Sequence, residues 1–230
     1  MARRETILDA VYGPPPGAAA IATMWSRALV ERLLKTVWAA FDDLRGGLFA
    51  SVDWTDDYDD LERSISQLLE QAIRRKMDGF APCFVQHGPF ERESRAGGRA
   101  QPPEYDIAFI WYADERIMWP LEAKVLRSDE DTDRNLGDYV STLTERFLTC
   151  RYAPFSAGGA MLGYLRGGDP ETVLGHIAQR LGCSPERYAV LTPRYHWTSE
   201  HQRTVPAGKD YPVAFVCHHL IMSLTPAESQ

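Results

Sequence analysis

Paired cysteines are missing from this chain. Its four cysteines stand far apart in the sequence, and no two of them form a Cys-x-x-Cys pair. This spacing argues against a zinc knuckle and against a disulfide framework. We therefore expect reduced, mostly buried cysteines of a cytoplasmic protein at Cys83, Cys150, Cys183 and Cys217.

An excess of positive charge and long apolar runs are missing as well. The chain has 25 Lys and Arg against 32 Asp and Glu, a formal net charge of −7. That balance argues against a protein that coats nucleic acid by charge alone, but it allows an enzyme with a local basic groove. Two long uncharged stretches, 11–26 and 152–165, are too short and too rich in Gly or Pro to span a bilayer. We expect neither a membrane partner nor a signal peptide.

What the chain does have is the composition of a globular protein. It has 230 residues, of which 44% are hydrophobic and 25% are charged, enough to bury a sizeable core. We expect an N-terminal arm and helix over 1–54, followed by one compact domain over 55–230. Periodicity predicts helices, with 3–4 spacing of apolar residues, over 22–44, 55–77, 135–150 and 170–181. It predicts strands over 83–90, 105–112, 117–126, 160–165, 188–191 and 213–224, and a polar loop over 196–210.

This order of elements predicts an α/β fold in which a mixed sheet is flanked by helices. The short polar turn 113–116 makes the second and third strands an antiparallel hairpin. Strand side chains alternate between faces, so Glu122 and Lys124 should point away from the face of Ala123. The turn places Asp106 opposite Ala123 and diagonal to Glu122. Two carboxylates and an ammonium should therefore meet near one strand end, a combination suited to Mg²⁺ and phosphate chemistry.

Asp106, the hairpin and the run Glu122-Ala123-Lys124 resemble the PD-(D/E)XK nuclease superfamily, which has the restriction-endonuclease-like αβββαβ core. The resemblance covers roughly 55–166, although the Pro-Asp dipeptide of that family is here Pro-Glu-Tyr-Asp, 103–106. It implies that Asp106, Glu122 and the Ala123 carbonyl bind Mg²⁺, or Mn²⁺ in its place, and that Lys124 assists the attacking water. The family often adds an acid from the first helix.

Two glutamates of the predicted helix 55–77 are candidates for that additional acid. Glu70 stands four residues before Arg74 and can form an ordinary surface ion pair with it, whereas Glu62 has only the neutral Ser66 at that spacing. We therefore predict that Glu62 joins the metal and catalytic site. A comparison of the two Gln variants would decide between them.

Other residues allow both a functional and a structural interpretation. Basic side chains of a Gly-rich loop and of the helix 135–150 could bind phosphates or could be solvated, namely Arg92, Arg95, Arg99, Arg146 and Arg151. His218 and His219 are adjacent in a strand, which favours one core and one surface histidine over a metal pair. His87 could border the cleft, although a hydrogen-bonded loop histidine is the simpler interpretation.

The resemblance implies an Mg²⁺-dependent endodeoxyribonuclease in a bacterial restriction or anti-phage defence setting. Its targeting would come from a second copy of the chain or from a partner subunit. Two alternatives stay open: an inactive binding or scaffold subunit that keeps the nuclease fold, and an RNA-cleaving toxin that uses the same residues. The sequence does not separate DNA from RNA, or endonuclease from exonuclease action.

Overall fold

The protein forms a seven-stranded mixed sheet with helices on both faces. The structure, a computed structural model, describes residues 7–13, 17–54, 60–79, 81–91, 93–94, 101–127 and 132–225. The strand order is β1-β2-β3-β4-β7-β6-β5. The three adjacent strands β3, β4 and β7 run parallel to one another. All other neighbouring pairs are antiparallel, namely β1–β2, β2–β3, β7–β6 and β6–β5. The strands are β1 (Cys83–His87), β2 (Ile107–Trp111), β3 (Met118–Leu126), β4 (Gly158–Leu165), β5 (Glu186–Arg187), β6 (His196–Gln202) and β7 (Ala214–Ser223).

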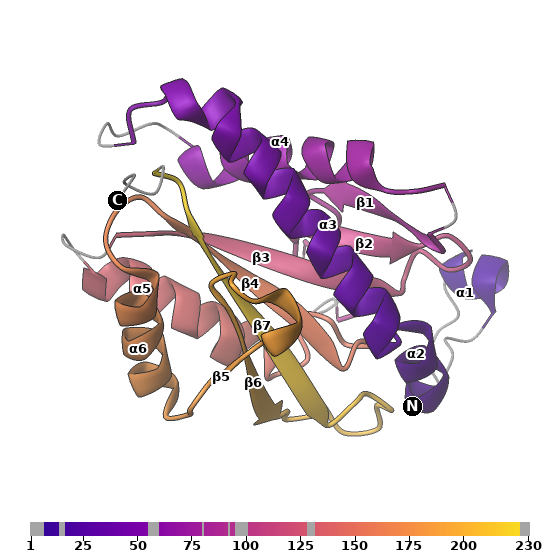
Figure 1. The fold of residues 1–230 in the computed structure, drawn as a ribbon. Helices are drawn as coiled ribbons and strands as arrows, with labels where there is room; N and C mark the ends of the chain where they lie inside the picture. The colour runs from indigo at the N-terminus through magenta and orange to yellow at the C-terminus, as the bar shows by residue number, and fades with distance from the viewer. Residues whose placement is uncertain are drawn as a thin grey trace.

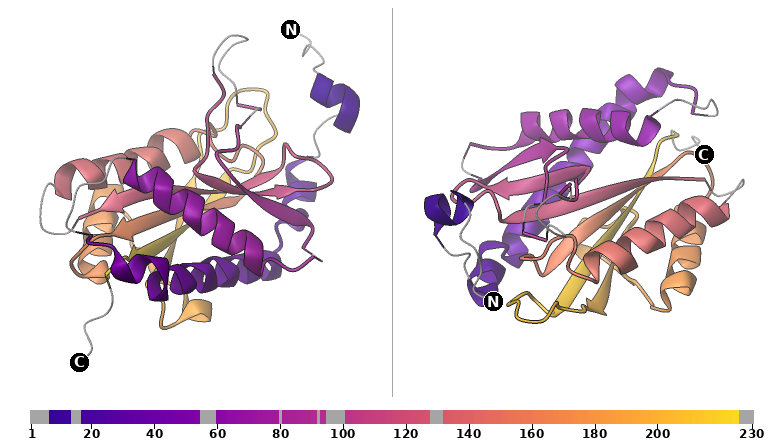
Figure 2. Two further views of the ribbon diagram at one scale, coloured as in Figure 1. Left: turned by 90° about the horizontal axis from the view of Figure 1, so that it is seen from above. Right: turned by 180° about the vertical axis from the view of Figure 1, so that it is seen from behind.

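The helices form two layers around this sheet (Figures 1 and 2). α3 and α4 pack against each other, α4 lies over β1, β2 and β3, and α5 and α6 contact β3 and β7 respectively. The predicted α/β class with a mixed sheet between helices is thus confirmed. The helical elements are α1 (Ile7–Tyr12), α2 (Ala18–Met24), α3 (Arg27–Gly46), η1 (Leu48–Ser51), α4 (Leu61–Lys76), α5 (Thr132–Ser141), the π-helical η2 (Thr142–Phe147), α6 (Pro170–Leu181) and η3 (Ala189–Leu191).

Two apolar clusters, one on each face of the sheet, fix these layers. The cluster on the α3–α4 side includes Leu34, Leu69 and Ala123, and the cluster on the other side includes Tyr139 and Met161. The apolar stripe predicted for 55–77 is buried against the sheet in α4, through residues such as Ile65 and Ile73. Since α3 shares this core with the strands, the N-terminal segment is packed onto the sheet.

Several predicted boundaries differ from the structure. The helix predicted over 22–44 is two helices, because Ser26 has extended backbone and its hydroxyl accepts a hydrogen bond from the Leu29 amide, which begins α3. Before the predicted helix, part of the N-terminal arm expected within 1–54 is itself helical, in α1 and at the start of α2. The helix predicted from residue 55 begins at Leu61, and 55–59 lie outside the described residues. The helix predicted over 135–150 begins at Thr132, and its later part is the π-helical η2.

The polar loop predicted over 196–210 was wrong in its first half, which forms β6 and pairs with β7 throughout. The strand predicted over 188–191 is the short helix η3. The prediction of one core and one surface histidine was also wrong, because helices or loops cover both faces of β7 and bury both His218 and His219. In the described part of the chain, no helix is long and apolar enough to cross a membrane.

Candidate active site

The β2–β3 hairpin brings Asp106 and Glu122 together where its backbone pairing ends. The last pair is Ile107 with Leu121, so one further step places Asp106 opposite Glu122. The Ala123 amide donates to Asp106 Oδ2 at 2.8 Å, and the Asp106 amide donates to Glu122 Oε1 at 3.3 Å. Side-chain carboxylates therefore take over the hydrogen bonds that backbone carbonyls would accept in a continued ladder.

This register is one residue away from the prediction, which placed Asp106 opposite Ala123. The difference arises in the turn: the Trp111 amide donates to the Ile117 carbonyl at 3.1 Å, so Tyr112 belongs to the turn and not to the strand. A buried ion pair between Arg116 and Asp114, at 2.7 Å, holds this five-residue connection. Because paired residues share a face, Asp106 and Glu122 lie on the same side of the hairpin.

Lys124 and Glu62 complete the group of charged side chains. Lys124 Nζ lies 2.7 Å from Glu62 Oε1 and also donates to the Ala123 carbonyl. The Val125 amide donates to Glu62 Oε2 at 3.3 Å. Glu62 stands in the first turn of α4. Because the apolar stripe of this helix packs on the sheet, the Glu62 carboxylate lies next to β3. Lys124 is thus held between a helix and its own strand.

The structure separates the two helix glutamates. Glu70 lies two turns after Glu62, is only 2% exposed, and accepts a hydrogen bond from Arg74 Nε at 2.9 Å. Among the described residues, no hydrogen bond or ion pair joins Glu70 to Asp106 or Lys124, and the α4 carboxylate next to Lys124 is that of Glu62.

Burial and mutual repulsion set the electrostatics of this site. Glu122 is 2% exposed, and this burial together with the negative charge of Asp106 raises its pKa well above the usual value; Lys124 and Arg146 oppose the shift. Burial also raises the pKa of Glu62, against the effect of Lys124. Burial lowers the pKa of Lys124, but Glu62, Asp106 and Glu122 outweigh it and the net pKa is raised. The ammonium is therefore charged at neutral pH, beside three carboxyl groups.

The donor atoms suit a hard divalent cation. Within the described residues, no three His, Cys, Asp or Glu side chains stand close enough together to hold a metal ion by themselves. Mg²⁺ is usually held by one or two carboxylates and keeps several waters. Asp106, Glu122 and the Ala123 carbonyl would supply oxygen ligands of that kind. Glu62, which we also expected among the metal ligands, contacts Lys124 and the Val125 amide.

Two surface depressions border the site and share Glu104. One has a volume of about 430 Å³ and is lined by Glu62, Asp106 and His87, among others. The other, of about 520 Å³, is lined by residues that include the predicted phosphate contacts Arg146 and Arg151. These two hollows offer room for a chain-like substrate on either side of Glu104.

Arg146 is held in place beside the second depression. Its Nη1 donates to the Tyr152 hydroxyl at 2.7 Å, and that hydroxyl donates to the Glu104 carbonyl at 2.9 Å. The guanidinium also lies over the Tyr152 ring. Arg63, which lines the first depression, was not singled out from the sequence, although its place next to Glu62 was the available signal. Arg92, Arg95 and Arg99 lie outside the described residues.

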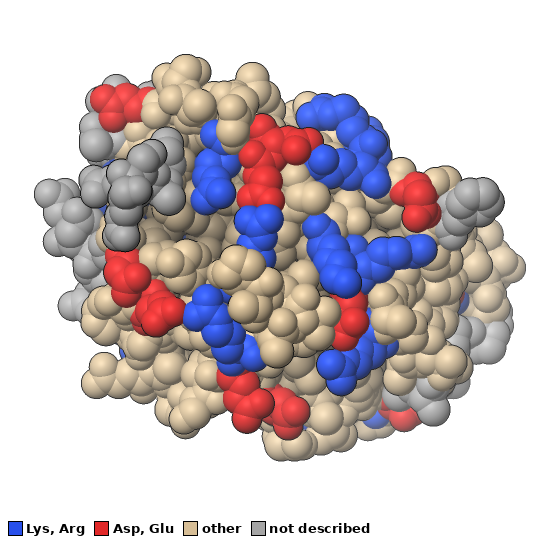
Figure 3. Space-filling model, in the orientation of Figure 1, with Lys and Arg blue, Asp and Glu red and all other residues tan. Residues whose placement is uncertain are grey.

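The face that carries α3 has a different character. Figure 3 shows basic and acidic side chains interspersed over it. Ion pairs account for much of this mixing, for example Arg27 with Glu31 at 2.8 Å and Lys76 with Asp43 at 2.6 Å. Among the described residues, the charges of this face form no continuous basic surface of the kind that a phosphate backbone selects.

Comparison with known proteins adds no relative. No family model, curated protein or solved structure matches this chain. A functional proposal therefore depends on the site itself, on its position in the fold and on the resemblance carried by its residues.

Proposed function

We propose that this chain is a metal-dependent phosphodiesterase that hydrolyses DNA at the site formed by Asp106, Glu122, Lys124 and Glu62. The observation that carries the proposal is the meeting of these side chains at the open end of the β2–β3 hairpin. The element order α4, β1, β2, β3, α5, β4, with β4 parallel to β3, is compatible with the αβββαβ core of the PD-(D/E)XK superfamily.

A bound Mg²⁺ would polarise the phosphate and lower the pKa of a coordinated water. Lys124 has a raised pKa, so its ammonium acts as a charged donor and not as a base. It would orient the attacking water and stabilise the negative charge that develops on the phosphoryl oxygens. Glu62 fixes the position of this ammonium through the 2.7 Å ion pair. Arg146 and Arg151 would contact flanking phosphates from the neighbouring depression.

The wider setting rests on the resemblance alone. We place the protein in a bacterial restriction or anti-phage system, where a second copy of the chain or a partner subunit supplies targeting. The net charge of −7 supports the proposal that a second chain contributes to DNA binding, since this chain lacks the overall basic character of a stand-alone DNA-binding domain.

A cleavage assay tests the proposal directly. The pure protein is incubated with supercoiled, linear and single-stranded DNA and with RNA, in Mg²⁺, Mn²⁺ or EDTA. We expect DNA cleavage in Mg²⁺ or Mn²⁺ and none in EDTA. Cleavage of RNA alone would favour the toxin alternative, and DNA binding without cleavage in either metal would favour the scaffold alternative.

Substitutions assign the residues. Lys124→Ala should lower cleavage at least ~100-fold while the protein still folds, whereas Lys76→Ala, which removes an exposed ion pair with Asp43, should not change it. Glu62→Gln should lower cleavage more than Glu70→Gln, because Glu70 contacts Arg74 and not Lys124. Activity that survives in Lys124→Ala, or a larger loss in Glu70→Gln, would contradict these assignments.

A further inference from the structure

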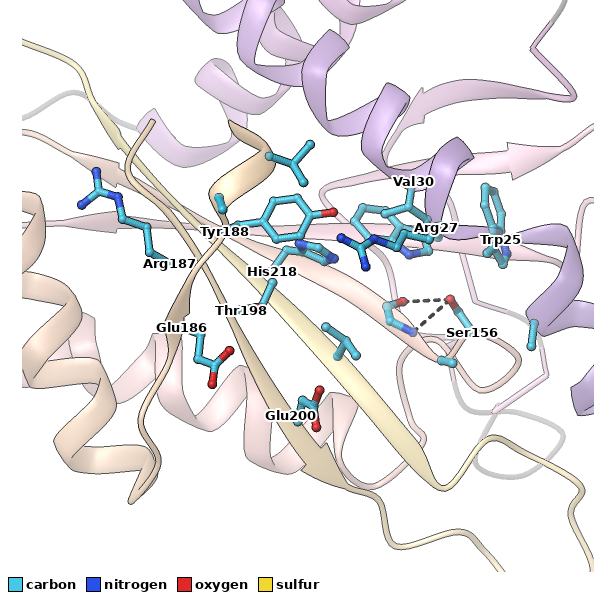
Figure 4. Close-up of a pocket in the computed structure, with 17 residues that line it drawn as sticks. Trp25, Arg27, Val30, Ser156, Glu186, Arg187, Tyr188, Thr198, Glu200 and His218 are labelled. Carbon is cyan, nitrogen blue, oxygen red and sulfur yellow. Dashed lines mark hydrogen bonds between the residues drawn. The ribbon is translucent and has the colours of Figure 1, made fainter. Parts of the chain in front are cut away.

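A second and larger cavity lies apart from the site around Glu122. It has a volume of about 540 Å³, within the range of small-molecule pockets, and shares no lining residue with the two depressions beside Glu104. Figure 4 shows that its lining comes from the α2–α3 junction, from the segment 186–190, and from β6 and β7. Trp119, near the start of β3, also lines it. Nothing in the proposed phosphodiesterase reaction uses this cavity.

A chain of hydrogen bonds from the core ends at this pocket. Trp38 Nε1 donates to His196 Nδ1 at 3.2 Å, and an indole nitrogen can only donate. His196, when neutral, must therefore carry its hydrogen on Nε2, which donates to His218 Nδ1 at 3.0 Å. By the same reasoning, His218 carries its hydrogen on Nε2. The tryptophan thus fixes the tautomers of both histidines.

Both histidines stay neutral at physiological pH. Burial lowers the pKa of His196 to about 2 and that of His218 to about 4. The pocket therefore contains the neutral imidazole of His218, and the hydrogen bond from His196 sets its orientation and the position of its hydrogen.

The Nε2–H group of His218 has no hydrogen-bond acceptor among the described residues. His218 is only 7% exposed, yet it lines the cavity, and Figure 4 shows its ring in the middle of the lining residues, beneath Tyr188. This donor is therefore open to the cavity, where water or a ligand can accept from it. A ligand that presents an acceptor at this point would satisfy it.

Two aromatic rings lie close to the His218 ring. The Tyr188 ring centroid lies 5.1 Å from that of His218, and the Trp119 centroid lies 5.9 Å away. Trp25 lines the cavity as well. Aromatic walls around a fixed donor favour a flat ring with a nitrogen or carbonyl acceptor.

The charged residues of the lining are balanced in sign. Arg27 and Arg187 carry positive charge, Glu186 and Glu200 carry negative charge, and each arginine is already paired with a glutamate outside the lining. This balance favours a neutral ligand over a phosphorylated one. The two lining carboxylates are acceptors for hydroxyl or amino groups on such a ligand.

We propose that this cavity binds a neutral nucleoside, whose base accepts a hydrogen bond from His218 Nε2–H and contacts the aromatic rings of the lining. Its sugar hydroxyls or exocyclic amino group would donate to Glu186 or Glu200. The ligand would also touch Trp119, three residues before Glu122 in the same strand.

Binding is tested on the full chain with adenosine, guanosine, cytidine, uridine and thymidine, each next to its 5′-monophosphate. Calorimetry and the fluorescence of the tryptophans are the readouts, since Trp25 and Trp119 line the cavity. We expect saturable binding of at least one nucleoside, with its monophosphate bound at least tenfold more weakly.

Two substitutions locate the binding. Ala157→Trp fills the cavity while Trp38, His196 and His218 keep their own side chains, and it should abolish binding. His218→Phe keeps a ring but removes the donor, and should weaken binding at least tenfold. The matched control, His176→Phe on the exposed side of α6, should change nothing. Unfolding is followed for each variant, because His218→Phe also removes the acceptor for His196.

Three results would overturn the proposal. The first is that no nucleoside binds the wild-type protein up to millimolar concentration. The second is that binding persists unchanged in Ala157→Trp. The third is that the monophosphates bind more tightly than the nucleosides. Loss of DNA cleavage in the Lys124 variant would leave this binding unaffected, so the two proposals fail independently.

Discussion

Replacing Glu122 with glutamine should make the protein more stable while it destroys cleavage. The carboxylate is almost fully buried, and the negative charge of Asp106 faces it, so its pKa is raised well above the usual value. The introduced glutamine would retain an oxygen to accept from the Asp106 amide, and its amide group could donate to the Asp106 carboxylate. The substitution therefore replaces a group whose ionised form is disfavoured by burial and by Asp106 with an amide that carries no charge at any pH.

We expect a gain of about 2 kcal/mol at pH 8 in the absence of metal, within the range seen when buried charges are replaced by neutral groups. For a chain of 230 residues, each kcal/mol shifts Tm by about 2 °C, so Tm should rise by about 4 °C. The difference in stability between the two proteins depends on pH. Below about pH 4.5 the carboxyl is protonated in both folded and unfolded chains, and the two proteins should be equally stable. As pH rises, the unfolded chain loses this proton first, and the wild type loses stability relative to the variant.

Divalent metal should make the wild type more stable than Glu122→Gln. At a Mg²⁺ concentration of about 100 times Kd, a ligand that binds only the folded state adds about 2.7 kcal/mol, and only the wild type has the full donor set. Thermal unfolding at pH 4.5 and pH 8, with EDTA or with Mg²⁺, measures all four conditions. A wild type that is more stable than Glu122→Gln at pH 8 in EDTA, or an equal Mg²⁺ effect on both proteins, would refute this reasoning.

Two further predictions concern the scaffold. Burial lowers the pKa of His196 to about 2, of His218 to about 4 and of His219 to about 3, so each stays neutral in the folded protein while the unfolded chain takes up protons below about pH 6.5. Urea unfolding should therefore show a loss of about 1.4 kcal/mol per histidine for each pH unit between about 6.5 and 5; a flat profile would contradict the buried neutral assignment. The buried Arg203 guanidinium donates to the backbone carbonyls of Phe147, Tyr152, Ala153 and Ser156. These hydrogen bonds hold the segment 147–156 in place. Arg203→Met should cost at least about 3 kcal/mol and lower Tm by about 6 °C, whereas a loss below about 1 kcal/mol would show that water replaces these bonds without penalty.

Local patterns in the sequence were enough to determine several elements. Asp169 accepts from the Thr172 amide and Gly182 ends the same helix at a positive φ of 63°, so α6 has the predicted bounds. The alternation along β3 also follows the prediction, with Ala123 in the core on the α4 side. These features depend on neighbours within a few residues, where side-chain period and capping chemistry decide the conformation.

Only the tertiary structure decided how distant segments meet. The polar composition of 196–202 predicts a loop, yet pairing with β7 supplies the hydrogen bonds that make it a strand. Trp38 and His196 are 158 positions apart, so no spacing in the sequence indicates their hydrogen bond or the tautomer that it fixes in His218. The ion pair between Glu62 and Lys124 likewise depends on where α4 settles over the sheet. The spacing of apolar residues in the sequence determines on which side of its helix or strand a residue lies. The packing of whole elements determines which distant residue it contacts.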